Sequence, residues 1–141
     1  MSEPLPPDRP AGLPPARPSA TFYELVGGEP TFTRLVAGFY ARVAGDAVLR
    51  PLYPEEDLGP AEERFRLFLI QYWGGPTTYS DQRGHPRLRM RHAPFAITAA
   101  ARDAWLNAMG ASLLDLELPE DHAEVLWTYL VNTAYAMQNQ P

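Results

Sequence analysis

The chain contains neither cysteine nor lysine among its 141 residues. Without cysteine it has no disulfide framework, no thiolate metal site and no cysteine nucleophile. All 12 basic residues are arginine, which excludes a Schiff-base lysine and the lysine of a phosphate-binding loop. These absences remove several large classes of enzyme mechanism.

Long hydrophobic runs and an excess of positive charge are also missing. No stretch approaches the roughly 20 apolar residues of a membrane span, and the first residues lack the pattern of a secretory signal. The net charge of −5 disfavours polyphosphate, so nucleic acid is not an expected partner. One globular domain is predicted, with the cytoplasm as its default location.

Proline is concentrated at the N-terminus, where residues 1–18 hold Pro4, Pro6, Pro7, Pro10, Pro14, Pro15 and Pro18. Proline supplies no N–H donor, and few apolar side chains accompany it, so residues 1–20 are predicted to form a disordered tail. A ligand for a proline-reading domain is the alternative, but nothing flanks these prolines to give specificity. The folded domain is predicted to span residues 21–141.

From residue 21 onward, apolar residues recur at the three- and four-residue spacing of helices. Proline and threonine at first-turn and cap positions mark the starts. Four long helices and one short one are predicted, beginning at Pro30, Pro60, about residue 86, Thr98 and Pro119. Residues 76–87 show little periodicity, and no segment alternates with a period of two. The predicted fold class is therefore all-α.

The three histidines are candidates for metal binding. His122 stands among acidic residues in the last predicted helix, and a solvated surface side chain is the prediction. His85 lies in a Gly-His-Pro loop, which indicates a role in a turn. His92 ends the short helix in apolar surroundings, where a satisfied core side chain and a ligand both remain open.

Four arginines, Arg83, Arg87, Arg89 and Arg91, lie close together with no acidic residue between the first and the last. This local excess of positive charge favours an anionic partner, such as a ligand carboxylate, a phosphate or the acidic helices nearby. A solvated loop is the alternative. No aromatic residues interleave for base stacking, so the cluster does not indicate nucleic-acid binding.

Polar aromatic residues occur on faces that are predicted to be buried, namely Tyr40, Tyr53, Tyr72 and Trp105. A buried phenol or indole needs a hydrogen-bond partner. One such group is ordinary in a core. Several on separate elements suggest a cavity in which their polar ends converge.

An ordered series of segments resembles the truncated haemoglobins of group II, the O-type branch. These segments are FYARV (39–43), LYPEEDL (52–58), AEER (61–64), QYWGGP (71–76), the stretch from Tyr79 to Phe95, and DAWL (103–106). The resemblance covers roughly residues 21–138. It implies an all-α, globin-like fold with four main helices packed two over two around a haem.

The resemblance also implies roles for single residues. His92 matches the proximal histidine that binds the iron of haem b, with its second ring nitrogen donating to a carbonyl. Positions that reach the haem propionates match Arg91, Tyr79 and Arg64. The apolar wall around the macrocycle would comprise Leu88, Phe95, Phe65, Phe68 and Leu69.

On the opposite, distal side, the polar aromatics of group II match Trp105, Tyr40 and Tyr53. Ala61 stands where many globins carry histidine or glutamine. Hydrogen bonds to the bound gas are therefore expected from the aromatic residues. These donors would stabilise a ligand that carries partial negative charge.

The function implied by the resemblance is reversible binding of O2, with CO and NO as further diatomic ligands. Tight binding with slow release suits oxygen chemistry or sensing better than bulk oxygen transport. The alternative is a haem enzyme for peroxide reduction or nitric oxide dioxygenation, and an unidentified reductase is a candidate partner. A haem-free helical interaction module is a third hypothesis, from a different class of protein.

Overall fold

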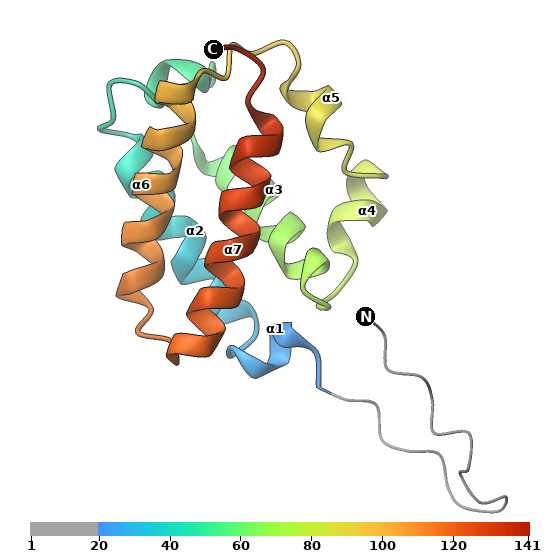
Figure 1. The fold of residues 1–141 in the computed structure, drawn as a ribbon. Helices are drawn as coiled ribbons and strands as arrows, with labels where there is room; N and C mark the ends of the chain where they lie inside the picture. The colour runs from blue at the N-terminus through green and yellow to red at the C-terminus, as the bar shows by residue number, and fades with distance from the viewer. Residues whose placement is uncertain (1–19) are drawn as a thin grey trace, which may run out of the picture.

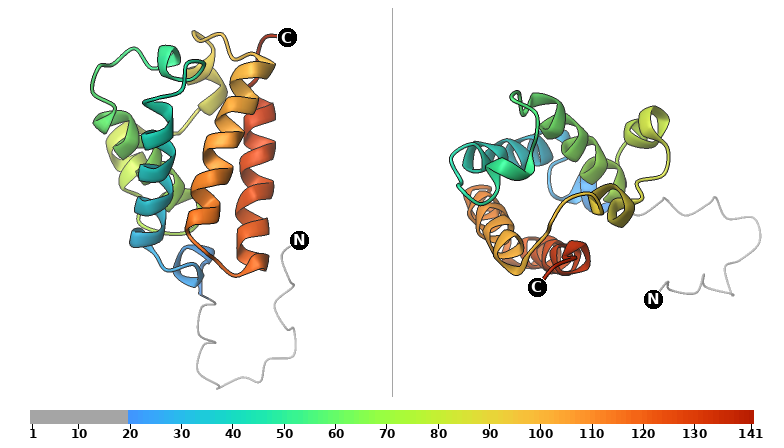
Figure 2. Two further views of the ribbon diagram at one scale, coloured as in Figure 1. Left: turned by 90° about the vertical axis from the view of Figure 1, so that its left-hand side faces the viewer. Right: turned by 90° about the horizontal axis from the view of Figure 1, so that it is seen from above.

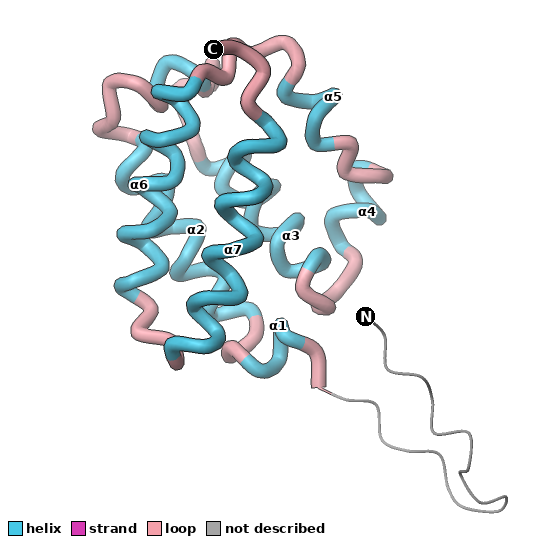
Figure 3. The backbone as a smooth tube through the Cα atoms, in the orientation of Figure 1, coloured by secondary structure: helices cyan, strands magenta, loops and turns pink. Residues whose placement is uncertain are grey.

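In the computed structural model, residues 20–141 are described; the predicted proline-rich tail lies almost entirely outside them. That part of the chain contains helices and loops but no strand, which confirms the all-α prediction (Figure 3). The helices are α1 (Phe22–Leu25), α2 (Glu29–Val43), α3 (Gly59–Tyr72), α4 (Thr78–Arg83), α5 (Leu88–His92), α6 (Ala99–Asp115) and α7 (Glu120–Met137), with a 3-10 turn at Arg50–Leu52.

The predicted starts of the four long helices are confirmed. Pro30 and Pro60 occupy the first turns of α2 and α3, where a missing N–H costs no hydrogen bond. Thr98 caps α6, because its side-chain oxygen accepts a hydrogen bond from the Ala101 N–H at 3.1 Å. Helix α7 begins directly after Pro119.

Two short helices were not predicted from the periodicity. Helix α1 begins with a capping box, in which Thr21 accepts from the Glu24 N–H and Glu24 accepts from the Thr21 N–H. Helix α4 falls in the stretch that shows little periodicity, and Tyr79 is its one buried residue. Short helices that bury so few side chains leave almost no periodic signal in a sequence.

The long helices form two pairs, with α2 and α3 on one side of the molecule and α6 and α7 on the other (Figures 1 and 2). Helix α2 packs against both α3 and α6, while α6 packs against α7. The short helix α4 lies beside α3, and α5 contacts α7. Within residues 20–141, no helix is both long and apolar enough to cross a membrane.

The core lies between the two pairs. Its large side chains are almost completely buried, and they include Phe32, Leu35, Phe39, Leu69, Met109, Leu126 and Leu130. One buried polar group joins the pairs, because the Ser112 hydroxyl on α6 donates to the Leu35 carbonyl on α2 at 2.6 Å. Helices α2 and α6 approach closely at this point, where α2 carries Gly38.

Gly38→Ala is expected to destabilise the fold, because a Cβ at Gly38 would overlap the Ser112 hydroxyl that binds Leu35. Overpacking of this kind lowers the free energy of unfolding by about 1–3 kcal/mol. Gly45→Ala is the matched control, since nothing lies within 4 Å of a Cβ at Gly45. Urea unfolding of both variants measures the difference. Equal midpoints would contradict the close packing of α2 on α6.

Two predictions of exposure were wrong. Tyr72 was predicted to be buried, but it is 53% exposed, although its ring packs against Phe68 and Tyr129. His122 was predicted to be solvated, but it is half-buried with its ring edge-on to Phe22 at 5.8 Å. Helix α1, which the periodicity missed, supplies that covering side chain.

Candidate functional site

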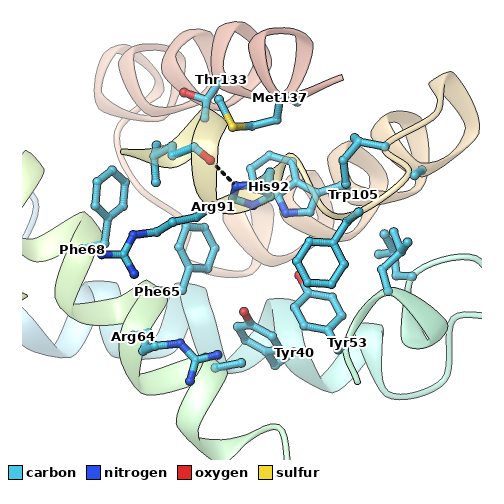
Figure 4. A pocket seen from close by; sticks show the side chains of 18 of the residues that line it. Tyr40, Tyr53, Arg64, Phe65, Phe68, Arg91, His92, Trp105, Thr133 and Met137 are labelled. Carbon is cyan, nitrogen blue, oxygen red and sulfur yellow. Dashed lines mark hydrogen bonds between the residues drawn. The ribbon is translucent and has the colours of Figure 1, made fainter. Parts of the chain in front are cut away.

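A cavity of about 500 Å³ lies between the helix pairs and reaches α4 and α5. Most side chains that line it are aliphatic or aromatic, and a few polar and charged groups converge on it. This volume and lining are typical of a site for a small molecule or cofactor. Figure 4 shows how its main side chains lie.

His92 lines this cavity from the last residue of α5. Its Nδ1 atom lies 2.7 Å from the Leu88 carbonyl oxygen, the bond that is dashed in Figure 4. A carbonyl only accepts, so Nδ1 carries a proton, and in the neutral ring Nε2 keeps a free lone pair. Histidines that bind metals usually donate their other ring N–H to such a carbonyl, and this hydrogen bond fixes the orientation of the ring. The expected donation to a carbonyl is thus present in the geometry.

Helix α5 is held in place by the side chain of Arg91. Its Nε donates to the Pro86 carbonyl at 2.7 Å, and its Nη2 lies 3.2 Å from the Arg83 carbonyl. Arg91 also lines the cavity. The guanidinium therefore ties α5 to the chain that precedes it while a part of it faces the cavity.

The three predicted distal aromatics meet on one side of the cavity. Tyr40 comes from α2, Tyr53 from the end of the 3-10 turn, and Trp105 from α6. The rings of Tyr40 and Tyr53 meet edge to face with centroids 5.6 Å apart. Trp105 packs against Phe39 at 5.6 Å and Phe65 at 6.2 Å. Packing on these rings restricts the orientation of the indole.

The two tyrosines of this group are held in their neutral form. Burial raises the pKa of Tyr40 far above the ordinary range, and the nearby Tyr53 raises it further. The pKa of Tyr53 is raised as well, again chiefly by burial. Both phenols therefore retain an O–H donor at physiological pH.

The raised pKa values of three tyrosines also predict how the stability of the protein depends on pH. Burial raises the pKa of Tyr129 to about 12, and the pKa values of Tyr40 and Tyr53 are also raised. Above the unfolded value of about 10, the unfolded chain loses protons that the folded chain keeps. The tyrosines' contribution to the free energy of unfolding is expected to be constant below that pH and to fall above it, by up to about 1.4 kcal/mol per pH unit for each such tyrosine.

Urea midpoints between pH 8 and 11 measure this dependence. Tyr129→Phe should make the alkaline fall shallower, because it removes one of the buried phenols. Tyr135→Phe is the matched control, because it removes the hydroxyl of a tyrosine that is 55% exposed. A midpoint that rises with pH above 10 would contradict the assignment.

Arg64 and Tyr79, which were predicted to reach the propionates, both line the cavity. Arg64 also pairs with Glu55, with Nη2 and Oε1 3.2 Å apart. The pKa of the Glu55 carboxyl is lowered by a hydrogen bond from the backbone N–H of Glu55, and Arg64 lowers it further. Tyr79 is buried, and the Arg83 guanidinium lies 5.9 Å from the centre of its ring.

The structure separates the arginine cluster into two groups. Arg83 and Arg91 line the cavity, although Arg83 is also exposed to solvent, whereas Arg87 and Arg89 are exposed and do not line it. The solvated-loop alternative therefore describes the second group. Arg87 directly precedes α5 and has a φ of +47°, a left-handed conformation that is uncommon for a residue with a side chain.

Four of the five predicted wall residues line the cavity, namely Leu88, Phe95, Phe65 and Phe68. The fifth, Leu69, is 1% exposed and belongs to the core instead. Ala61, at the position where other globins carry a polar side chain, is buried and lines the cavity too.

One wall of the cavity was missed by the sequence analysis. It comes from α7 and comprises Tyr129, Leu130, Thr133, Ala134 and Met137. Most of these residues belong to the helical periodicity that predicts the last helix. A stripe that lines a cavity and a stripe that packs into a core have the same spacing, so the sequence carries no signal that separates them.

Comparison with known proteins identifies the fold. A model of the bacterial-like globin family matches residues 21–139. The chain belongs to this globin family. It is 42% identical to the group 2 truncated hemoglobin YjbI of Bacillus subtilis, over 84% of this chain and 88% of that protein. The family resemblance to group II truncated haemoglobins is thereby confirmed.

Solved structures of truncated globins superpose closely on this one. A thermostable hemoglobin from Thermobifida fusca is 67% identical, with a TM-score of 0.84, over 85% of this chain and 98% of that chain. The truncated oxygen-avid haemoglobin from Bacillus subtilis is 40% identical, with a TM-score of 0.80, over 85% of this chain and 100% of that chain. The two-over-two globin fold is therefore confirmed.

Membership of the truncated globins implies haem and the binding of diatomic gases, and the cavity of this globin fits such a group. In globins the haem iron is held by an axial histidine nitrogen, and His92 lines the cavity with its Nδ1 bonded to a carbonyl and its Nε2 available. The largely apolar lining suits the macrocycle, while Arg64, Arg83 and Arg91 supply positive charge for acidic substituents.

Proposed function

We propose that this globin binds haem b through His92 and uses it to bind O2 reversibly, with CO and NO as alternative ligands. The observation that carries the proposal is the 2.7 Å bond from His92 Nδ1 to the Leu88 carbonyl. In the neutral ring this bond leaves Nε2 free to bind a metal, on a side chain that lines a largely apolar cavity. The haem would supply the iron to which the gas binds.

The chain's own residues orient the group and exclude water. Phe65, Phe68 and Leu88 line the cavity and would cover the apolar macrocycle, while Arg91, Arg64 and Tyr79 would pair with its propionates. Arg64 forms an ion pair with Glu55, and Arg91 donates two hydrogen bonds to backbone carbonyls. Each arginine is thus oriented by protein contacts before any anion binds, which lowers the conformational entropy lost on binding.

The distal aromatics supply the polar contacts to the gas. Trp105 donates its indole N–H, and Tyr40 and Tyr53 are neutral donors because burial raises the pKa of each. Ala61 offers no polar atom at its position on α3. A diatomic ligand with partial negative charge is stabilised by such donors in a largely dry pocket.

Peroxide reduction, nitric oxide dioxygenation and a reductase partner remain predictions, as does a cytoplasmic location. Among the described residues, no side chain of the cavity favours either enzymatic reaction over reversible binding. Titration of the haem-free protein with haem tests the proposal. One equivalent should produce a Soret band that saturates, and the ferrous form should shift on addition of CO. A titration without saturable binding would favour the haem-free interaction module instead.

A further inference from the structure

The last residues of the chain pack against the loop that follows His92. After α7 ends at Met137, the chain runs beside residues 93–98, which connect α5 to α6 (Figure 1). Asn139 makes the contacts. Its Oδ1 accepts from the Ile97 N–H at 2.9 Å, and its Nδ2 donates to the Phe95 carbonyl at 2.9 Å. Its Nδ2 also lies 3.5 Å from the His92 carbonyl.

Backbone bonds add to these side-chain bonds. The N–H groups of Asn139 and Gln140 both reach the Ile97 carbonyl, at 3.0 and 3.1 Å. Ile97 itself lines the cavity. The C-terminal segment is therefore bonded to both polar backbone groups of a cavity residue, five positions after His92.

A second contact holds the start of this segment. Arg102, in the first turns of α6, donates to the Gln138 side-chain oxygen at 2.7 Å. Its guanidinium also lies 4.2 Å from the centre of the Tyr135 ring. The position of Asn139 is thus fixed relative to α6 and α7, the helices that form one side of the cavity.

Helix α5 depends on such outside contacts, because it is only five residues long. A helix of this length is not stable by itself in water. Arg91 ties α5 to the preceding chain through the carbonyls of Pro86 and Arg83. Asn139 ties down the chain that leaves α5, so the two ends are held by different elements.

We propose that Asn139 is a positioning residue for His92. It acts through the backbone of residues 92–97 and limits the displacement and rotation of the imidazole. The inference rests on the proposed ligation of the haem iron by His92. It assigns to the C-terminal segment a function in holding the cofactor, although Asn139 itself does not line the cavity.

Asn139→Ala tests the inference, with Asn107→Ala as the control. Asn107 is an exposed residue of α6. Asn139→Ala removes the side-chain bonds and leaves the backbone bonds to Ile97 in place. We expect haem transfer to excess apomyoglobin to be about three to ten times faster, on the scale of one net hydrogen bond. The iron–histidine stretching band in resonance Raman should broaden or shift, and the control should match the wild type.

Asn139→Asp separates the donor from the acceptor. It retains an oxygen for the Ile97 N–H but places a carboxylate against the carbonyls of Phe95 and His92. Amide hydrogen exchange in the haem-free protein should show Ile97 protected in Asn139→Asp and about ten times less protected in Asn139→Ala. Haem loss from Asn139→Asp should be at least as fast as from Asn139→Ala.

Two results would overturn the inference. One is an unchanged rate of haem loss and an unchanged stretching band in Asn139→Ala. The other is faster haem loss with an unchanged band, which would show that the bonds stabilise the loop without positioning His92. A wild-type protein that binds haem but lacks the iron–histidine band would instead refute the proposed ligation by His92.

Discussion

Replacement of His92 by glycine is expected to abolish the five-coordinate ferrous spectrum and to reduce haem retention sharply. The imidazole of His92 is the one histidine side chain that lines the cavity, and its Nδ1 is already committed to the Leu88 carbonyl. Removing it would delete the proposed axial bond to the iron and leave an opening at the end of α5. Added imidazole should partly restore the spectrum, because a free ring can occupy that opening.

The other two histidines serve as controls. His85 is exposed in the loop before α5, where its Nδ1 accepts from the Arg87 N–H at 3.3 Å. His122 lies in the first turn of α7, against Phe22. His85→Ala and His122→Ala should both keep the iron–histidine stretching band. Retention of the band in His92→Gly together with its loss in His85→Ala would show that the ligand has been misassigned.

Trp105→Phe is expected to speed O2 dissociation by about ten- to a hundredfold. A hydrogen bond from the indole N–H to a partly charged oxygen is worth roughly 1.5–3 kcal/mol in a dry pocket. Each 1.4 kcal/mol, roughly, is a factor of ten in rate or equilibrium constant. Phenylalanine removes the donor and keeps most of the apolar bulk that packs on Phe39 and Phe65. Stopped-flow and flash photolysis measure the rate.

CO provides the control for the same variant. Its outer oxygen carries less negative charge, so CO dissociation should change less than O2 dissociation. Equal acceleration of both gases would indicate steric gating in place of hydrogen bonding. An O2 rate that stays unchanged while stability falls would reduce Trp105 to a packing role.

The two tyrosines complete this series of variants. Tyr40→Phe and Tyr53→Phe are expected to have smaller or opposite effects, because donors that share one ligand are coupled. Their rings meet edge to face at 5.6 Å, so each substitution also alters the surroundings of the other phenol. The double variant Tyr40→Phe/Tyr53→Phe therefore measures their coupling, and strict additivity would contradict a shared ligand.

Much of the fold could be predicted from the sequence, because its long helices carry local signals. Proline in the first turn, the Thr98 cap and apolar residues at helical spacing are all readable without tertiary information. Helices α1 and α4 carried too few buried side chains to show periodicity. The exposure of Tyr72 and the burial of His122 depend on which element packs on them, and a single helix pattern does not encode that.

The candidate site was predicted by resemblance more than by chemistry. Apolar surroundings alone left His92 open between core residue and ligand, and only the ordered family motifs favoured the ligand. The structure brings His92, Trp105, Tyr40 and Tyr53 to one cavity, as those motifs imply. Leu69 departs from the expectation, because its face of α3 points into the core.

The contacts of Asn139 were not predictable from the sequence. They join residues 42 or more positions apart through side-chain and backbone groups, and no spacing pattern marks such pairs. The same is true of the α7 wall, whose residues look like ordinary core positions. Long-range polar contacts and cavity walls are both consequences of how the helices pack, and they appear only in the structure.

Cycling the ferrous, haem-loaded protein between O2 and nitrogen while recording its absorption spectrum tests the central proposal most directly. Reversible binding in a cavity with neutral tyrosine and tryptophan donors predicts that each exposure to O2 yields the same spectrum and each removal restores the five-coordinate ferrous form. Conversion to the ferric form within the first cycle, or no spectral change on exposure to O2, would contradict the account.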